Sequence, residues 1–413
     1  MSAPSSPRVT PPADRLDRAV PTGLDAIFRP RSVAVIGASR RPGSIGAAIF
    51  RNLLKQGFEG PVYPVNPQAS VVQSVLAWPT VNDIPGDVDL AVIAVPSKQV
   101  LAAVEDCGRK GVRGIVVITA GFKETGAEGA ERERAVRDCA RRYHMRMVGP
   151  NCLGVLNTEA GVRLDATFAP AWPPAGNVAF SSQSGALGLA ILETAGALGL
   201  GISHFVSVGN KADVSGNDLL EYWEQDPGTS TILLYLESFG NPRRFTQIAR
   251  RVARKKPIVA VKSGRTQAGA RAASSHTGSL AGADNAVDAL CRQSGVIRTD
   301  TIEEMFDVAM LLANQPLPKG GRVGIVTNAG GPAIMASDAC ESHGLELATL
   351  SPTTIETLRS YLPPEASVKN PVDMIASATA TCKSAIAAGL MSVMYSRGTP
   401  SPKTRVTYTG NVW

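Results

Sequence analysis

The chain has 413 residues, of which 44% are hydrophobic, 19% charged and 5% aromatic, and its formal net charge is +7. This composition excludes a disordered chain, and at roughly 150 residues per domain the length predicts two to three globular domains. The positive charge fits a nucleic acid or a small polyanion. Arginines are spread along the chain, however, and no RNP-type or zinc-finger pattern occurs, so we expect no nucleic-acid partner.

Residues 1–23 are rich in Pro, Ser and Arg and contain no apolar core, so we predict a disordered tail rather than a secretory signal. The six cysteines form no CxxC pair, which disfavours a zinc site and fits reduced thiols in the cytoplasm. The most apolar long stretch, SGALGLAILETAGALGLGI from Ser184, is rich in Gly and Ala and contains Glu193. We therefore predict a buried helix there and not a membrane span.

Three segments repeat one design: an apolar strand, a turn of small polar residues, and a helix. They begin at equal intervals, at Val33, Val178 and Val323. The interval is the length of one α/β domain, so we predict three domains that each open with strand, turn and helix.

The predicted boundaries are 24–153, 154–317 and 318–380. The third domain would be only partial, because the alternation of strands and helices stops after NPVDMIASATA at 370–380. We expect residues 381–413 to be an aberrant or disordered tail.

Within each domain, short and nearly continuous apolar runs are followed by turns and then by helical segments. Such runs are typical of strands buried on both faces of a parallel sheet, and their alternation with helices predicts a doubly wound α/β fold. The predicted strands are 62–67, 90–97, 114–122 and MRMVGPN in the first domain, NVAFSS, GISHFVSVG, TSTILLYLE and PIVAVKSG in the second, and GLELATL in the third. The predicted helices are 44–56, 98–110, 127–143, 217–224 and 242–254.

The first turn, GASRRPGSIG, presents backbone N–H groups at a helix start, which suits a phosphate. Gly37 allows the tight turn, while Gly43 and Gly46 permit close approach of the backbone and packing. The spacing is not GxGxxG, and the second strand ends at Asn66 rather than at an acid that would hold a ribose. We predict a nucleotide-like ligand other than nicotinamide; the alternative is a glycine-rich turn with no ligand.

The second and third turns are SSQSGALG at 181–188 and TNAGGPA at 327–333. Both place hydroxyl or amide side chains at a helix start, where each could hold an anion. Ordinary helix N-caps have the same residue types, so one such turn alone would be weak evidence for an anion site. Two of them on successive domains predict a shared phosphate site.

Two residues are candidates for catalysis. His276 lies in a loop of small residues, SSHTGSLAG, and its imidazole could accept a phosphoryl group. Glu237 ends a predicted strand and could stabilise a charged imidazole. The alternatives are a capping histidine and a solvated acid. His144, His204 and His343 are predicted to be structural or surface residues, and Cys152 a small packed thiol.

Taken together, these motifs resemble the nucleoside-diphosphate-forming acyl-CoA synthetases, the ADP-forming acetate–CoA ligase group related to the succinyl-CoA synthetase alpha subunit. The similarity covers residues 24–380. The motifs that carry it occur in order as GASRRPGSIG, PVNP, AVPS, ITAGF, GPNCLG, SQSGALG, SVGNKADV, YLES, SHTGSLAG, TNAGGPA and NPVD.

The resemblance implies a Rossmann-like CoA-binding domain followed by flavodoxin-like domains. It also implies the reaction acyl-CoA + ADP + phosphate ⇌ carboxylate + CoA + ATP, through an acyl phosphate and a phosphohistidine. His276 would be that histidine and Glu237 its stabilising acid. CoA would contact Gly37, Ser39, Gly43, Ser44, Ile45, Gly46, Asn66, Pro96, Ser97, Ile118, Thr119 and Ala120. Phosphate would contact Asn151, Ser182, Gln183, Ser184, Gly185, Asn328, Ala329, Gly330 and Gly331.

In this family ATP or ADP, with Mg2+, binds an ATP-grasp domain, and the chain contains none. We therefore expect a partner subunit or domain that supplies it, in a homo- or hetero-oligomer, with acyl-CoA, phosphate and a small carboxylic acid as the small-molecule partners. The alternatives are a CoA-binding regulatory or inactive remnant of such a ligase or of a related protein acetyltransferase, and a nicotinamide-dependent oxidoreductase. The acyl group is not encoded in the turns.

Overall fold

The computed structural model describes residues 23–265, 284–315 and 320–375. The chain divides into two compact units, one up to Ala313 and one from Asn314 onward.

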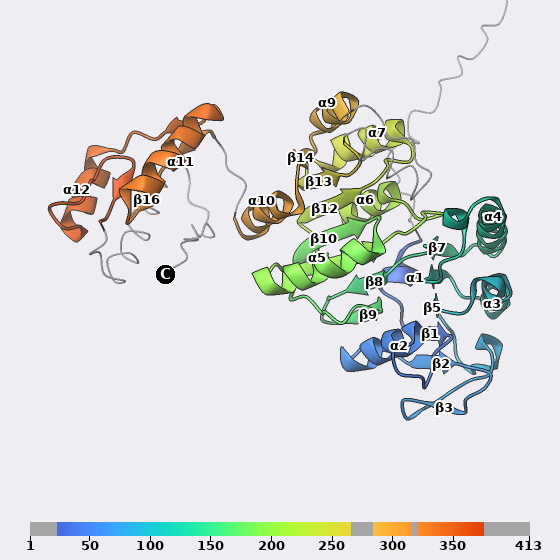
Figure 1. Cartoon of the computed structure of the whole chain (residues 1–413). Coiled ribbons are helices and arrows are strands. Elements are labelled where there is room, and N and C mark those ends of the chain that lie inside the picture. Colours follow the sequence, from blue (N-terminus) through green and yellow to red (C-terminus); the bar gives the residue numbers. More distant parts are fainter. Residues whose placement is uncertain (1–22, 266–283, 316–319, 376–413) are drawn as a thin grey trace, which may run out of the picture. The chain divides into compact units, whose positions relative to one another are not determined.

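The first unit begins with a parallel five-stranded sheet in the order β2-β1-β5-β6-β7 (Figure 1). Its central strands are buried along their whole length, as predicted for a sheet covered on both faces. Helices α1 and α2 cover one face and α3 and α4 the other. The bounds are α1 Asp25–Phe28, β1 Val33–Ile36, α2 Ile45–Lys55, β2 Val62–Val65, β5 Leu90–Ile93, α3 Ser97–Lys110, β6 Gly114–Val117, α4 Ala127–Arg142 and β7 Arg146–Val148, with a hairpin of β3 Val71–Val72 and β4 Val75–Leu76 and short 3-10 turns η1 Val81–Asp83 and η2 Lys123–Thr125.

The second sheet of this unit has seven strands in the order β14-β13-β12-β10-β11-β8-β9. Helices α5 and α10 cover one face, and α6, α7 and α9 cover the other. The bounds are β8 Gly154–Asn157, β9 Leu164–Thr167, β10 Ala175–Ser182, α5 Gly185–Leu198, β11 Ile202–Ser207, α6 Gly216–Gln225, β12 Thr231–Leu236, α7 Pro242–Val252, β13 Ile258–Lys262, α9 Asp284–Ser294, β14 Ile297–Thr299 and α10 Ile302–Asn314.

The parallel parts of both sheets share one strand order. Counted along the chain, it is 2-1-3-4-5 in each, so the strand order reverses between β1 and β5 and again between β10 and β12. This is the doubly wound α/β class predicted from the sequence. In such sheets ligands bind beyond the carboxyl ends of the strands at the reversal point.

Strand β8 pairs antiparallel with β11 on one side and with β9 on the other, and neither β8 nor β9 was predicted. Each has only four residues, and they lie among Gly, Asn and Asp without an intervening helix, so nothing in the local pattern indicates them.

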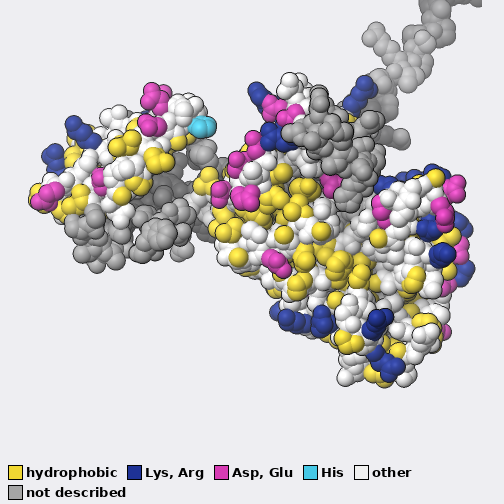
Figure 2. Space-filling model, in the orientation of Figure 1, with side chains coloured by type: hydrophobic (Ala, Val, Ile, Leu, Met, Phe, Trp, Pro, Cys, Tyr) yellow, Lys and Arg dark blue, Asp and Glu magenta, His cyan; other side chains and the backbone are white. Residues whose placement is uncertain are grey.

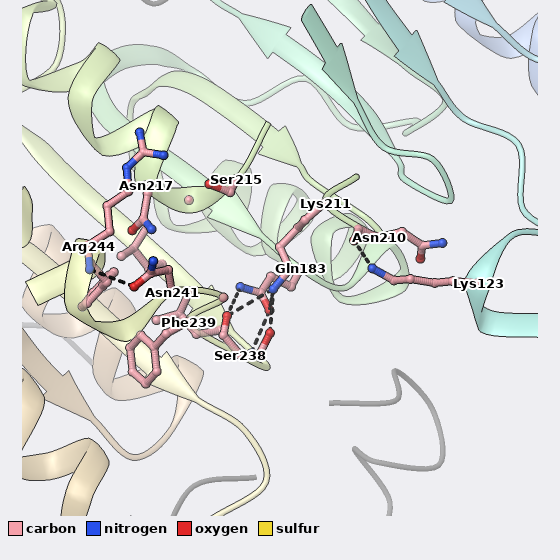
Figure 3. Close-up of a pocket in the computed structure, with 15 residues that line it drawn as sticks. Lys123, Gln183, Asn210, Lys211, Ser215, Asn217, Ser238, Phe239, Asn241 and Arg244 are labelled. Atoms are coloured by element: carbon pink, nitrogen blue, oxygen red, sulfur yellow. Dashed lines mark hydrogen bonds between the residues drawn. The ribbon is translucent and has the colours of Figure 1, made fainter. Parts of the chain in front are cut away.

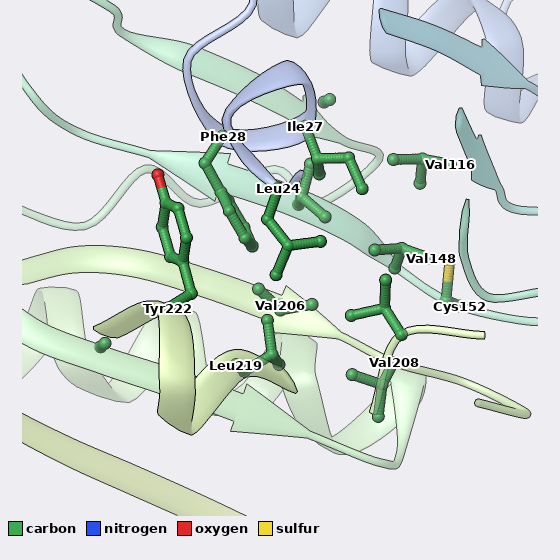
Figure 4. Packing of buried hydrophobic residues seen from close by; sticks show 14 of the residues in the cluster. Leu24, Ile27, Phe28, Val116, Val148, Cys152, Val206, Val208, Leu219 and Tyr222 are labelled. Atoms are coloured by element: carbon green, nitrogen blue, oxygen red, sulfur yellow. The ribbon is translucent and has the colours of Figure 1, made fainter. Parts of the chain in front are cut away.

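One hydrophobic core joins the two sheets (Figure 4). Leu24, Ile27 and Phe28 of α1 lie between them and contact apolar residues from both sides. Polar contacts reinforce the junction. Asn52 donates to the carbonyls of Thr167 and Ala169 at 2.9 and 2.7 Å, and further bonds run from Arg29 to Asp226, Glu159 and Tyr222.

The prediction that α5 is a buried helix is wrong. Only Gly188, Ile191, Leu192 and Ala195 are buried, and Leu198 is 47% exposed. The helix is a surface helix whose outer face carries small and apolar residues, and hydrophobic side chains gather over α5 and α10 (Figure 2). Among the described residues no helix combines the length and the apolar character that crossing a membrane requires.

The second unit contains two pairs of parallel strands, β15–β17 and β16–β18, with α11 and α12. Its first strand, predicted as one run from Val323, is divided because the N–H of Ile325 donates to Asn370 at 2.8 Å. The bounds are β15 Arg322–Val323, β16 Val326–Thr327, α11 Gly330–Ser342, β17 Glu346–Leu347, α12 Pro352–Tyr361 and β18 Val372–Asp373. The tail predicted for 381–413 lies outside the described residues.

Candidate functional site

The turn after β1 owes its shape to two glycines. Gly37 has φ 94°, and a Cβ placed on Gly46 would lie 2.0 Å from the carbonyl oxygen of Gly37. Gly46 therefore permits the close packing of α2 against the turn after β1, and Gly37 permits the turn to pass close to the backbone of Ala94. Gly43, at φ 79°, has open space around its Cα, so it is the glycine that leaves room for a ligand.

The predicted CoA turn has a positively charged and accessible rim. Ser44 caps α2 by accepting from the N–H of Ala47 at 3.4 Å, and the hydroxyl of Ser39 accepts from the N–H of Arg41 at 3.0 Å. Arg40 and Arg41 are exposed and form no ion pair with any described residue. A free helix start beside two unpaired guanidinium groups suits a diphosphate.

Asn66 has a structural task in this turn. Its side chain donates to the carbonyl of Ala38 at 2.7 Å and accepts from the N–H of Gln68 at 2.8 Å. The residue that replaces the expected ribose-binding acid therefore holds the end of β2 against the turn.

A cavity of about 840 Å³ opens where the carboxyl ends of both sheets meet. Around it the structure brings together some of the residues predicted to contact CoA and some of those predicted to contact phosphate. From the predicted set it is lined by Ile45, Ile118, Thr119, Ala120, Asn151, Gln183, Ser184, Gly185 and Glu237. The other predicted residues of the first unit, namely Gly37, Ser39, Gly43, Ser44, Gly46, Asn66, Pro96, Ser97 and Ser182, do not line it.

Two backbone segments from the first sheet meet at this cavity. The hydroxyl of Thr119 donates to the carbonyl of Val95 at 2.7 Å, which ties the turn after β6 to the loop that leads through Pro96 to Ser97, the first residue of α3. The N–H of Asn151 donates to the carbonyl of Thr119 at 3.0 Å. Asn151 has φ 57°, so this turn holds a non-glycine residue in the left-handed region.

Gln183 joins the ends of β10 and β12 at the reversal point. Its side-chain oxygen accepts from the N–H groups of Glu237 and Ser238, both at 2.9 Å, and its amide donates to the carbonyl of Ser238 at 2.8 Å. This side chain therefore positions Glu237. Ser184 caps α5 by accepting from the N–H of Leu187 at 3.3 Å. The first N–H groups of α5, which no helix satisfies internally, open into the cavity beside Gly185.

The turns before α5 and α11 have the same local geometry. The hydroxyl of Ser182 donates to the carbonyl of Ser184 at 2.7 Å and accepts from its N–H at 3.2 Å. The hydroxyl of Thr327 does the same with Ala329, at 3.1 and 3.2 Å. The pairing of the two turns thus extends to their hydrogen bonds. The predicted phosphate residues Asn328, Ala329, Gly330 and Gly331 belong to the second unit.

Lys211 and Asn210 also line the cavity, and sequence reasoning missed them. Asn210 donates to Glu124 at 2.6 Å and to Glu133 at 2.8 Å, so the first sheet's domain holds the loop that follows β11. The signal was a lysine in the turn sequence SVGNKADV, directly after a predicted strand.

The remaining candidates have mixed outcomes. Cys152 is 5% exposed, its thiol donates to the carbonyl of Val117 at 3.3 Å, and burial raises its pKa to about 12, so it is a packed thiol as predicted. His204 is buried among aromatic rings, while His144 and His343 are exposed. His276 lies outside the described residues. The described residues include no cluster of His, Cys, Asp or Glu that could hold a metal ion.

Comparison with known families gives three matches. Residues 31–158 match the description CoA binding domain, residues 175–312 match Succinyl-CoA ligase like flavodoxin domain, and residues 323–394 match Ligase-CoA domain.

Individual relatives agree with these matches. The chain is 50% identical to the acetate–CoA ligase [ADP-forming] II subunit alpha of Pyrococcus furiosus, over 86% of this chain and 77% of that one. It is 48% identical to acetate–CoA ligase [ADP-forming] I of Archaeoglobus fulgidus, of which it spans about half, 51%. Among solved structures, the dinucleotide forming acetyl-coenzyme A synthetase 1 of Ca. Korarchaeum cryptofilum, in complex with phosphate and ADP, superposes with a TM-score of 0.82 at 43% identity, over 86% of this chain and 76% of that one.

Proposed function

This chain belongs to the ADP-forming acetate–CoA ligase family, and on that basis we propose that it is an acid–thiol ligase component for the reaction acyl-CoA + ADP + phosphate ⇌ carboxylate + CoA + ATP. The observation that carries the proposal is the cavity that gathers Ile118–Ala120, which are predicted to contact CoA, the α5 start and Glu237 around one space.

CoA would rest its diphosphate on the α2 start, where Gly43 leaves open space and Arg40 and Arg41 are unpaired among the described residues. Its pantetheine arm would pass Ile45 and the segment Ile118–Ala120 toward Gly185. When bound, CoA supplies the thioester that phosphate attacks. The protein's part is to hold the phosphate at a helix start, where backbone N–H groups stabilise its charge.

Phosphoryl transfer would then use His276. A phosphate oxygen attacks the acyl carbonyl and the C–S bond breaks, which leaves an acyl phosphate and the CoA thiolate that takes up a proton. An imidazole nitrogen of His276 next attacks phosphorus and releases the carboxylate. Glu237, positioned by Gln183, would stabilise the charged ring during this step.

The nucleotide half of the reaction would take place on a partner. We propose an ATP-grasp subunit or domain that binds ADP and Mg2+, in keeping with relatives that are named as alpha subunits. The five described cysteines are free thiols, which supports a reducing, cytoplasmic location. The carboxylate released in the reaction would come from a small carboxylic acid.

The test is phosphorylation by labelled ATP in the presence of an ATP-grasp partner. We expect acid-labile, base-stable label on the wild type and on His343→Ala, whose exposed ring lies on α11's end, and none on His276→Ala. If the His276→Ala variant is still labelled, His276 is not the phosphorylated residue. A wild type that binds CoA but is never labelled would instead identify a regulatory remnant.

A further inference from the structure

Lys211 occupies an unusual backbone position at the centre of the site. It lies in the turn after β11 with φ 56°, a region that costs an L-residue roughly 1–2 kcal/mol. The turn is held there by bonds from the N–H of Asn210 to the carbonyl of Pro150 at 2.9 Å and from the N–H of Ala212 to the carbonyl of Gly149 at 3.2 Å. Strain of this kind concentrates at functional sites.

Among the described residues, the hydrogen-bond partners of the Lys211 ammonium group are all neutral. It donates to the hydroxyl and the carbonyl of Ser238 at 2.7 and 3.2 Å and to the side-chain oxygen of Gln183 at 3.1 Å (Figure 3). Within the described parts of the chain no carboxylate lies within 4.0 Å of it. A partly buried ammonium group that no described carboxylate contacts directly is unfavourable, so the site is suited to accept an anion.

The same group faces the cavity in which the phosphate is expected. Lys211 and Lys123 are the cationic residues that line it. Lys123 already has a partner, because it lies 3.7 Å from Glu133 and donates to the carbonyl of Asn210. The α5 turn, Ser182–Gly185, is uncharged. Of the described residues around the cavity, Lys211 is thus the cation that remains available.

We propose that the Lys211 ammonium binds the inorganic phosphate that attacks the acyl thioester and supplies the positive charge that the α5 turn lacks. The proposal rests on the proposed ligase function. Lys211 also lines a smaller cavity of about 390 Å³ at the starts of α6 and α7, so its side chain forms part of the wall between the two spaces (Figure 3).

The charge environment of this group also makes a pH test possible. Burial lowers the pKa of Lys211 to about 8, Lys123 and Lys262 act in the same direction, and Glu237 opposes them. Inorganic phosphate is already mostly dianionic at pH 7.5 and becomes fully so toward pH 9.5, a change that by itself would strengthen its binding to a cation. A loss of phosphate affinity across that range would therefore report on the lysine.

The experiment compares the wild type with Lys211→Met, Lys211→Arg and the exposed control Lys55→Met. Inorganic phosphate and CoA binding are measured by calorimetry, and phosphate-dependent CoA release from acetyl-CoA is measured with the partner subunit present. Loss of a charged hydrogen bond predicts that Lys211→Met raises both the dissociation constant and the KM for phosphate about 10-fold to 100-fold. CoA affinity should stay within about twofold of the wild type, Lys211→Arg should recover part of the loss, and Lys55→Met should match the wild type.

A Lys211→Met protein that binds phosphate as the wild type does would overturn the proposal. If the wild type binds phosphate through Lys211 but releases no CoA, the ligase function fails and the phosphate site stands. If Lys211→Met does not fold, the wild-type pH profile decides. A phosphate affinity that falls above pH 8 supports the role of Lys211, and a flat profile from pH 7.5 to 9.5 refutes it.

Discussion

Gly46 offers the sharpest test of how the CoA turn is built. A Cβ at this position would lie 2.0 Å from the carbonyl oxygen and 2.8 Å from the carbonyl carbon of Gly37. Both atoms belong to the backbone, so they cannot rotate away, and α2 would have to move from β1 by more than an ångström. Replacing Gly46 by Ala should therefore be destabilising even though alanine favours a helix.

The magnitude follows from two opposing effects. Overpacking a tight contact costs about 1–3 kcal/mol, and a Gly→Ala change inside a helix gains about 1 kcal/mol. We expect Gly46→Ala to lower the free energy of unfolding by up to about 2 kcal/mol. Gly196→Ala is the matched control, since Gly196 is an exposed helical glycine of α5 with nothing within 4 Å of its Cβ, and it should gain up to about 1 kcal/mol.

The assay is urea unfolding combined with hydrogen exchange of the β1 amides, because the chain contains more than one domain and a single midpoint would be ambiguous. CoA titrations measure the effect of each variant on CoA affinity as well. Gly43→Ala meets no neighbour, but its φ of 79° strains an L-residue by roughly 1–2 kcal/mol, so it should weaken CoA binding with a loss of stability similar to that of Gly46→Ala. A Gly46→Ala protein as stable as Gly196→Ala would refute the packing argument.

Three further predictions concern other parts of the first unit. Glu237→Gln should slow phosphorylation of His276 at least about 10-fold at unchanged CoA affinity, because a neutral amide cannot stabilise the charged ring; an unaltered rate would remove Glu237 from the mechanism. Burial lowers the pKa of His204 from 6.5 to about 4, so below pH 6.5 the unfolded chain binds a proton that the native state lacks. Unfolding free energy should thus fall by about 3 kcal/mol between pH 6.5 and pH 4, and His204→Phe should flatten this part of the urea-measured pH profile relative to the wild type; equal slopes would contradict the assignment. Asn52→Ala leaves two buried carbonyls unpaired and should cost about 2–3 kcal/mol in urea unfolding, whereas the exposed Asn82→Ala should cost less than about 0.5 kcal/mol; equal losses would exclude Asn52 as a tie between the two sheets.

The parts of the fold that local patterns encode were predictable. Continuous apolar runs identified the parallel strands other than β14 and β18, and Ser44 and Ser184 marked the starts of α2 and α5. The two turns before α5 and α11 were paired from residue type, and they share one hydrogen-bond pattern.

What escaped prediction depends on contacts between distant segments. Strand β8 forms by pairing with β11, and β9 forms by pairing with β8. The position of Lys211 depends on Gln183, on Ser238 and on the loop that Glu124 and Glu133 hold, and no spacing rule relates these residues. Similarly, the small residues of α5 suggested burial, whereas one face of the helix is exposed, because composition reports the character of a helix but not how many neighbours cover it.

Because α1 packs between the two sheets, the first two domains of this protein are not structurally independent. Leu24, Ile27 and Phe28 take their apolar neighbours from both sides, and the side chain of Asn157 donates to the carbonyl of Phe28 at 2.8 Å. A fragment that ends before Gly154 would keep α1 but lose the contacts that α1 makes with the second sheet. The apolar side chains of α1 would then be exposed and would promote aggregation. Exchange of this domain between relatives should therefore succeed only when the apolar residues of both sheets that contact α1 are exchanged with it.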